Sequence, residues 1–362
     1  MDLSIANFVR LNKVVVIWTA FAGLLYLFRD MFGLIFITFV MCFVAHGLTT
    51  RHRLRGPLSR RLLVVLLYAL FLILVGVYVV FFVPRLMNEA KSFTEQLPAT
   101  LITIERWLEA QAPDGSGLEP VLDRIRLMLT PEQLILKSWA LGRGVMEKAL
   151  HYLAWFFLGL LFSFLIMLDL PRLARSIREL RFTRAALVYE ETVDSVIQFA
   201  TVVGRNFRAQ ILISTLNTFM TAIGLMVMGV GGIVLLSTMV FFCGLIPVLG
   251  VFISSIPITL MAVNYGGVTL GVWALVMIAI IHMVEAYILN PRIVSRVMQL
   301  NPVMTLLILY IAHSLIGLWG MLLGVPIAVY IYRYLILNGS KRENGPAHAA
   351  GEAAKGPPGE AV

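Results

Sequence analysis

Charged residues are scarce in this chain of 362 residues. Asp, Glu, Lys and Arg together make up 14% of the sequence, whereas hydrophobic residues make up 59%. Soluble proteins carry roughly 25% charged residues, so the composition excludes an ordinary soluble domain and predicts an integral membrane protein. The net charge of +9 does not indicate nucleic-acid binding, because the arginines cluster beside apolar runs, as in RHRLRGPLSRR at 51–61.

Cysteine is almost absent from the sequence, and the common enzyme motifs are absent. Cys42 and Cys243 stand in separate apolar runs, so the sequence indicates neither a disulfide framework nor a metal site. The sequence has no HExxH, GxSxG or phosphate-binding glycine and lysine motif. We therefore expect a protein that is not an enzyme, that needs no cofactor and that is driven by an ion gradient or by the concentration difference of its own substrate.

Long apolar runs, in contrast, are abundant. A spanning helix needs about 20 apolar residues, and the stretches that qualify are 14–28, 31–48, 62–83, 149–168, 210–229 and 268–284. Two further runs, 233–263 and 303–332, are too long for one straight span and too short for two. We predict an all-α polytopic membrane protein with about six spanning helices plus two re-entrant hairpins, or eight hydrophobic segments.

Glycine and proline interrupt both of the long runs near their middle. The first contains GLIPVLG at 244–250, and the second contains IGLWGMLLGVP at 316–326. Paired Gly/Pro-interrupted segments point to the binding site of a transporter. A kinked single span is the alternative reading of each run.

Arginine and lysine counts orient the chain. The 49–61 loop carries five arginines and no acid, so the positive-inside rule places it, and with it the N-terminus, in the cytoplasm. If 233–263 is a re-entrant hairpin, Arg292 and Arg296 reach the cytoplasm and so does the C-terminus. The expected parts are spans 1–3 in 1–83, an extracytoplasmic helical insert in 84–148, span 4 with cytoplasmic amphipathic helices in 149–209, a transport block with both hairpins in 210–337, and a disordered cytoplasmic tail in 338–362.

Three stretches carry a resemblance to a known family. RAQILISTLN, GLIPVLGVFISSIPITLMA, and HMVEAYILNPRIVSRVMQLNPVMTLLILYIAHSLIGLWGMLLGVPIAVY resemble the AI-2E family of bacterial membrane transporters, and the similarity covers nearly the whole chain. The resemblance implies a multi-pass protein of the bacterial inner membrane that forms homo-oligomers. Ala286 stands where Asn often follows the Glu of the family, and Asn301 stands where His often precedes the Pro; both departures bear on the substrate.

The resemblance leaves more than one function open. Family members are described as exporters of the quorum-sensing signal autoinducer-2 or as sodium(lithium)/proton antiporters. We expect export of a small polar solute such as autoinducer-2 by alternating access, with antiport of a monovalent cation and protons as the alternative. A membrane scaffold that transports nothing is a further alternative, but it leaves the broken helices without a purpose.

Polar residues in the apolar runs are the candidate substrate path. Glu285 is a functional candidate because an acid at membrane depth is costly, although an ion pair with an arginine is equally compatible. His282 lies three residues earlier on the same helix face, where it would relay protons or make an interfacial hydrogen bond. The full candidate set is Asn217, Pro247, Gly250, Ser254, Ser255, His282, Glu285, His313, Gly317 and Gly320.

A second group of residues is assigned to topology or to subunit interfaces. Asn290 and Pro291 are expected to end the helix of the last regular span, because the residue before a proline disfavours helical geometry. The group consists of Asn290, Pro291, Arg292, Arg296 and Pro302.

The expected topology is open to a labelling experiment. A cysteine at Ser116, in the 112–120 loop, should react with an impermeant thiol reagent added to intact cells, whereas a cysteine at Ser295 should react only after the membrane is opened. Cys42 and Cys243 are first replaced by alanine. Labelling of position 295 from outside would rule out the re-entrant hairpin at 233–263.

Overall fold

The computed structural model describes residues 26–51, 57–111, 131–293 and 301–332, together with isolated positions before residue 26; throughout 131–152 it describes the backbone alone. The regular elements in these ranges are all helices. Six helical segments are long and apolar enough to cross a membrane. The predicted all-α polytopic fold is therefore confirmed, while the predicted span at 14–28 and the tail at 338–362 lie largely or wholly outside the described residues.

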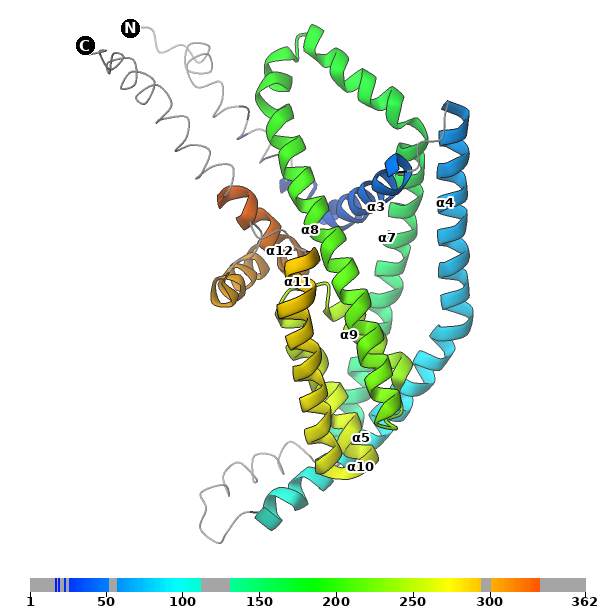
Figure 1. Ribbon diagram of the computed structural model, residues 1–362, viewed down its shortest axis with the longest axis vertical. Coiled ribbons are helices and arrows are strands. Elements are labelled where there is room, and N and C mark those ends of the chain that lie inside the picture. Colours follow the sequence, from blue (N-terminus) through cyan, green and yellow to red (C-terminus); the bar gives the residue numbers. More distant parts are fainter. Residues whose placement is uncertain are drawn as a thin grey trace, which may run out of the picture.

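The elements follow one another along the chain as helices of very different length. They are η1 (Arg29–Met31), α3 (Phe32–Arg51), α4 (Pro57–Val77), η2 (Tyr78–Phe82), α5 (Val83–Gln111), α7 (Pro131–Glu179), η3 (Leu180–Phe182), α8 (Ala186–Val227), α9 (Ile233–Cys243), α10 (Leu249–Val284), η4 (Glu285–Leu289), α11 (Asn290–Ile293) and α12 (Pro302–Tyr330). Figure 1 shows α4, α7, α8 and α10 running roughly along the long axis, with α3 crossing them.

The predicted outer insert begins as a direct continuation of the third span. The π-helical turn η2 joins α4 to α5 without a break, so the helix runs on past the expected boundary at residue 84. Figure 1 shows this path descending through the length of the molecule to the end where α5 meets α10. A π turn inside an α-helix widens the backbone locally and is frequent at functional sites.

The stretch 169–209, expected to form one or two cytoplasmic amphipathic helices, forms the end of α7 and the beginning of α8. The 3₁₀ turn η3 and the short segment after it connect these two helices. At this end of the molecule Asp169 forms ion pairs with Arg172 at 3.6 Å and with Arg61 at 3.9 Å. All three side chains are more than half exposed, so these pairs add little stability. They show, however, that the arginines at the start of α4 and at the end of α7 share one end of the fold.

Apolar contacts hold the helices together in several clusters. Phe36 of α3 stacks edge-on against Phe207 of α8, with ring centroids 4.7 Å apart, and both side chains are buried. Between α4 and α7 the hydroxyl groups of Tyr68 and Ser163 hydrogen-bond to each other in the interior. Many large apolar side chains instead face outward, among them Phe81 and Trp273 at 62% and 61% exposure, as expected where lipid replaces water.

Both of the Gly/Pro-interrupted runs are broken in the structure. In the first run, α9 ends at Cys243 and α10 begins at Leu249, so the break falls on the predicted IPVLG segment. In the second run, α12 breaks at Ile316 and Gly317, where Gly317 takes a φ of 60°. A Cβ atom on Gly324 would touch Ala312 and Ile308, so the two halves of α12 fold back against each other. The re-entrant placement of these hairpins in the bilayer stays a prediction.

One expectation about helix ends is wrong. Asn290 and Pro291 do not end the helix, because α11 continues through them to Ile293. The π turn at Glu285–Leu289 immediately precedes them. A π turn bonds five residues apart instead of four, so the wider backbone accommodates a proline ring that lacks the N–H donor of a regular turn.

Two glycines in helices allow a test of the packing. A Cβ atom on Gly204 of α8 would overlap the Phe43 ring, whereas one on Gly76 of α4 would meet nothing within 4 Å. We expect Gly204→Ala to destabilise the fold by about 1–3 kcal/mol through overpacking and Gly76→Ala to stabilise it by up to about 1 kcal/mol through helix propensity. Thermal unfolding in detergent measures both changes, and equal shifts in the two variants would contradict the α3 and α8 packing.

Candidate functional site

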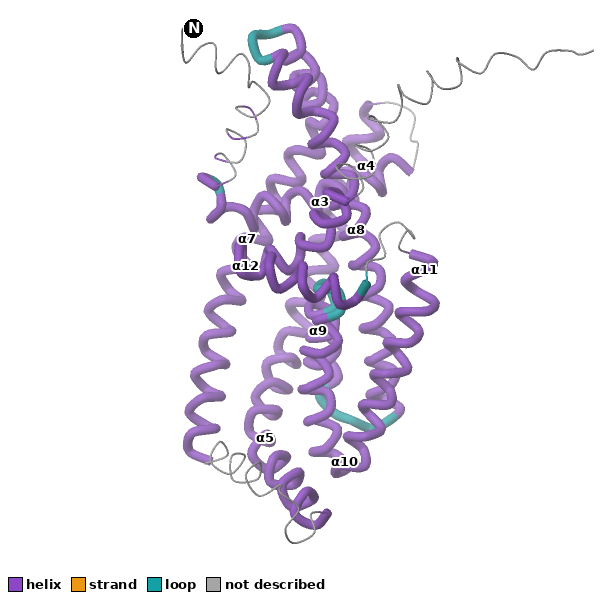
Figure 2. The backbone as a smooth tube through the Cα atoms, turned by 90° about the vertical axis from the view of Figure 1, so that its left-hand side faces the viewer, coloured by secondary structure: helices purple, strands orange, loops and turns teal. Residues whose placement is uncertain are grey.

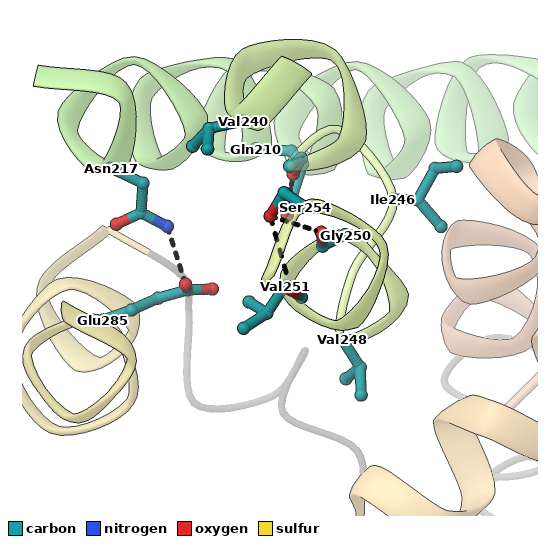
Figure 3. A pocket seen from close by; sticks show the side chains of 10 residues that line it. Gln210, Asn217, Val240, Ile246, Val248, Gly250, Val251, Ser254 and Glu285 are labelled. Atoms are coloured by element: carbon teal, nitrogen blue, oxygen red, sulfur yellow. Dashed lines mark hydrogen bonds between the residues drawn. The ribbon is translucent and has the colours of Figure 1, made fainter. Parts of the chain in front are cut away.

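A small cavity lies where the turn between α9 and α10 meets α8 and η4. Its volume is about 30 Å³, which is space for about two water molecules. Figure 3 shows the residues that line it converging from these elements. They are Gln210, Asn217, Val240, Gly244, Ile246, Val248, Gly250, Val251, Ser254 and Glu285.

Glu285 supplies the only ionisable side chain among these ten described lining residues. It is the first residue of the π turn η4, and its side chain is 14% exposed. Its Oε2 accepts a hydrogen bond from Nδ2 of Asn217 at 2.7 Å, drawn in Figure 3, and lies 3.7 Å from Nδ1 of His282. The carboxylate therefore points into the protein, toward α8.

Asn217 contributes an acceptor as well as this donor. Its Oδ1 is buried and has no hydrogen-bond partner among the described residues, and the residue as a whole is 7% exposed. An unsatisfied buried acceptor costs about 1–3 kcal/mol. The amide thus turns its nitrogen toward the Glu285 carboxylate and its unbonded oxygen away from it (Figure 3).

The turn that closes the cavity is tight and strained. Val248 takes a φ of 65°, the one positive φ of a non-glycine residue in the described part of the chain. A β-branched residue in this region is an outlier that costs on the order of 1–3 kcal/mol. A Cβ atom on Gly250 would overlap the Cys243 carbonyl, so only glycine permits this approach of α10 to the end of α9.

Side chains of α8 bind the backbone carbonyls that this break leaves free. Gln210 donates from Nε2 to the Gly244 carbonyl at 2.5 Å, and Ser214 donates from Oγ to the Phe241 carbonyl at 2.5 Å. Gln210, Ser214, Asn217 and Thr221 are spaced at i, i+4, i+7 and i+11, which places them on one face of a helix. The face of α8 toward the hairpin is therefore a polar stripe.

The structure brings together part of the predicted substrate path. Asn217, Gly250, Ser254 and Glu285 line the cavity, and His282 lies at its edge through Glu285. Ser254 bonds back to the Gly250 carbonyl at 2.9 Å. Pro247 lies in the turn itself, and its carbonyl accepts from the Leu249 amide at 2.7 Å.

Other predicted residues lie elsewhere. Ser255 bonds to the Phe252 carbonyl of its own helix, and His313 is an exposed residue of α12. Gly317 and Gly320 belong to the break in α12, where a Cβ atom on Gly320 would overlap the Ala312 carbonyl. Arg292 is exposed near the end of α11; Pro302 begins α12 behind the N-cap Asn301, and Arg296 lies outside the described residues.

Sequence reasoning missed several lining residues. Gln210 and Gly244 carry a hydrogen bond of the site, while Val240, Ile246, Val248 and Val251 supply its apolar walls. A signal for Gln210 was available, because it stands seven residues before Asn217 and thus on the same helix face. No sequence signal marks the apolar members, since valine and isoleucine fill the whole region.

A family model described as the AI-2E family transporter matches residues 15–336. The chain belongs to this family. Among its relatives is the YdbI protein of Bacillus subtilis (strain 168), whose name describes a candidate transport protein; it is 29% identical over 340 residues, covering 91% of this chain and 93% of the relative. A protein of Halobacillus andaensis named sodium-lithium/proton antiporter is 25% identical over 292 residues, covering 77% of this chain and 81% of the relative.

These matches make the chain a multi-pass membrane protein of a bacterial transporter family. A further relative from Alkalihalophilus pseudofirmus, also named as a candidate transport protein, is 23% identical over 291 residues. In the described part of this AI-2E transporter, no group of three or more His, Cys, Asp or Glu side chains is arranged to hold a metal ion.

The tight turn generates a prediction for transport. Gly250→Ala should reduce the rate at which the transported substrate crosses the membrane of proteoliposomes at least tenfold. The reason is that the new methyl group forces the end of α9 away from α10 and deforms the cavity. Ser255→Ala, one turn along α10 but outside the cavity, is the matched control and should keep normal flux. Full activity of Gly250→Ala would show that transport does not use this turn.

Proposed function

We propose that this AI-2E transporter exchanges a monovalent cation, sodium or lithium, for protons, and that Glu285 is the group that binds either one. The observation that carries the proposal is the largely buried carboxylate of Glu285, which lines a cavity of about 30 Å³ and is held there by a hydrogen bond from Nδ2 of Asn217. Acidic residues at membrane depth commonly mark ion and proton pathways.

The chemistry of the cavity favours a small cation. Its lining includes the carboxylate of Glu285 and the hydroxyl group of Ser254, and oxygen atoms are the ligands that hard cations prefer. The carbonyl ends of a broken helix bind Na⁺ or H⁺ in several transporter folds, and α9 ends at this cavity. A site with one carboxylate balances the charge of one monovalent cation or one proton, and this equivalence is the basis of exchange.

The relative from Halobacillus andaensis supports the same proposal, because it is named a sodium-lithium/proton antiporter. His282 is then the nearest group for handing on the proton, since its Nδ1 lies 3.7 Å from the Glu285 carboxylate and its side chain is 48% exposed. Alternating access would come from movement of the α9 and α10 hairpin against α8, across the interface that contains the cavity.

Export of a small polar solute such as autoinducer-2 is the second candidate. Gln210, Ser254 and Asn217 favour it, because they offer neutral hydrogen-bonding groups beside the turn. A cavity with room for about two water molecules would have to widen severalfold before such a solute could enter. This requirement places solute export second.

The setting of the site completes the proposal. All of its lining residues fall within 210–285, in the segment assigned to the transport block. We place the protein in the bacterial inner membrane with the Arg61, Asp169 and Arg172 end in the cytoplasm, in accord with the positive-inside rule. The family resemblance favours a homo-oligomer, and nucleic acid has no part in the proposed activity.

Replacing Glu285 with glutamine separates the two candidates. Glu285→Gln removes the titratable charge at nearly constant shape, so sodium-driven and lithium-driven proton movement in proteoliposomes should fall at least a hundredfold. Glu190→Gln is the control, because it removes the same charge from α8 about 30 Å along the helix from Gln210.

The same vesicles are loaded with autoinducer-2 in a second assay. Normal exchange of cations by Glu285→Gln would contradict the proposed function. Autoinducer-2 efflux that is equal in the wild type and in Glu285→Gln, with no cation exchange in either, would establish solute export in its place.

A further inference from the structure

One face of α5 is built to hold the α9 and α10 hairpin. Glu89, Phe93 and Gln96 are spaced at i, i+4 and i+7, so they lie on a single face. Phe93 packs against the apolar cluster around Leu236, Ile258 and Met261. In Figures 1 and 2 α5 and α10 lie together at the end of the molecule away from α12. We call Glu89, Phe93 and Gln96 the α5 face.

Two hydrogen bonds join the α5 face to the two arms of the hairpin. Oε2 of Glu89 accepts from the backbone N–H of Leu235, in the first turn of α9, at 2.7 Å. Oε1 of Gln96 accepts from Nδ2 of Asn264 of α10 at 2.7 Å, two residues before the break at Gly266 and Gly267. Both arms are therefore fixed at the end opposite to the cavity.

α9 lacks an N-terminal cap of its own. Its N-cap residue is Gly232, with a φ of 70°. All residues of α9 are described, and among them no side chain caps the N-terminus and no acid occurs in the first turn. The first N–H groups of any helix need external partners, and the helix dipole favours a negative charge at this end. Glu89 supplies both from a helix that lies 146 positions earlier in the sequence.

The cap at one end of α9 bears directly on the cavity at the other. α9 has 11 residues, so it is a rod of about 16 Å. Its far end carries the Phe241 and Gly244 carbonyls that Ser214 and Gln210 bind. A short helix moves as one piece, so a displacement at Leu235 is transmitted to the cavity-lining residues Val240 and Gly244.

We propose that Glu89 is a positioning residue of the transport site, acting as the N-terminal cap of α9 from a separate helix and thereby setting the shape of the cavity around Glu285. The proposal rests on the proposed function in one respect, that the cavity is where the transported ion binds. Glu89 itself does not touch the transported ion. Its loss should therefore change ion affinity and cavity access more than the maximal rate.

The test compares Glu89→Ala, Glu89→Gln and the control Glu95→Ala. Glu95 lies on the same helix, pairs with Lys91 at 3.9 Å and is 61% exposed. Hydrogen bonds to charged groups are about twice as strong as neutral ones. We expect Glu89→Ala to raise the half-saturating sodium concentration on the order of tenfold and Glu89→Gln to raise it less, since a glutamine oxygen still accepts. Glu95→Ala should match the wild type.

The accessibility of a thiol group in the cavity can be measured without any transport assay. A cysteine at Ser254, with Cys42 and Cys243 replaced by alanine, should react faster with a small thiol reagent when Glu89 is alanine than when it is glutamate. Val234→Glu, which places an acid in the first turn of α9, should partly restore both the sodium dependence and the slow labelling of Glu89→Ala.

Each outcome decides the question. Unchanged sodium dependence and unchanged labelling in Glu89→Ala would overturn the proposal, as would equal effects of Glu89→Ala and Glu95→Ala. If Glu89→Ala does not fold, the graded change in Glu89→Gln decides in its place, and a wild-type value there overturns the proposal. If sodium is not the transported ion, the labelling result still tests the positioning role, so the two proposals fail separately.

Discussion

The structure depends on how it satisfies the backbone groups that are freed where α9 ends and α10 begins. Water hydrogen-bonds such groups in a soluble protein, but a membrane interior offers no water, so protein must do so. Gln210 and Ser214 bind the carbonyls at the Cys243 end of α9, and Glu89 binds an amide at its other end. The short helix is stable in this environment because two other helices provide its caps.

These bonds satisfy the break, but one of the residues that line the adjoining cavity keeps a polar atom without a hydrogen-bond partner among the described residues. Asn217 lies on the same stripe of α8 as Gln210 and Ser214, yet among the described residues only its amide nitrogen has a partner, the Glu285 carboxylate. The interface between the turn and α8 also encloses the cavity of about 30 Å³. An interface with an unpartnered acceptor and an empty volume loses less free energy when it rearranges than a close-packed one, which makes this the interface where movement during transport is expected.

The sequence predicts the class of fold well and the site only in part. Apolar runs report directly on spanning helices, and glycine with proline reports on breaks, so the interruptions near 247 and 317 were predictable. The continuity of α4 with α5 was harder to predict. The two helices are joined by η2 without a structural break, although the composition of the residues shifts there from apolar to polar. The continuation through Pro291 was also missed, since the π turn that permits it leaves no pattern in the residue types.

Within the site, the hydrogen bonds that could not be predicted are those between residues far apart in the sequence. Asn217 and Glu285 were each suspected for the cost of a polar group in lipid, but their pairing depends on how α8 and η4 pack. Glu89 gave no signal at all, because an acid in a mixed-charge helix is ordinary until its hydrogen bond to Leu235 is seen. His313 is a polar residue in an apolar run that lies on an exposed surface of α12, away from the cavity, and its place in a substrate path stays a prediction.

The two broken helices have different parts in this arrangement. The halves of α12 close on each other, and its buried Leu309, Val325 and Val329 pack in one cluster with Ile246 at the tip of the first hairpin. The tip therefore has an apolar neighbour in α12 on one side and hydrogen-bond donors of α8 on the other. Apolar contact is not directional, whereas the bonds from Gln210 and Ser214 require particular distances and angles. The directional bonds from α8 therefore define the position of the tip and, with it, the geometry of the cavity at Glu285.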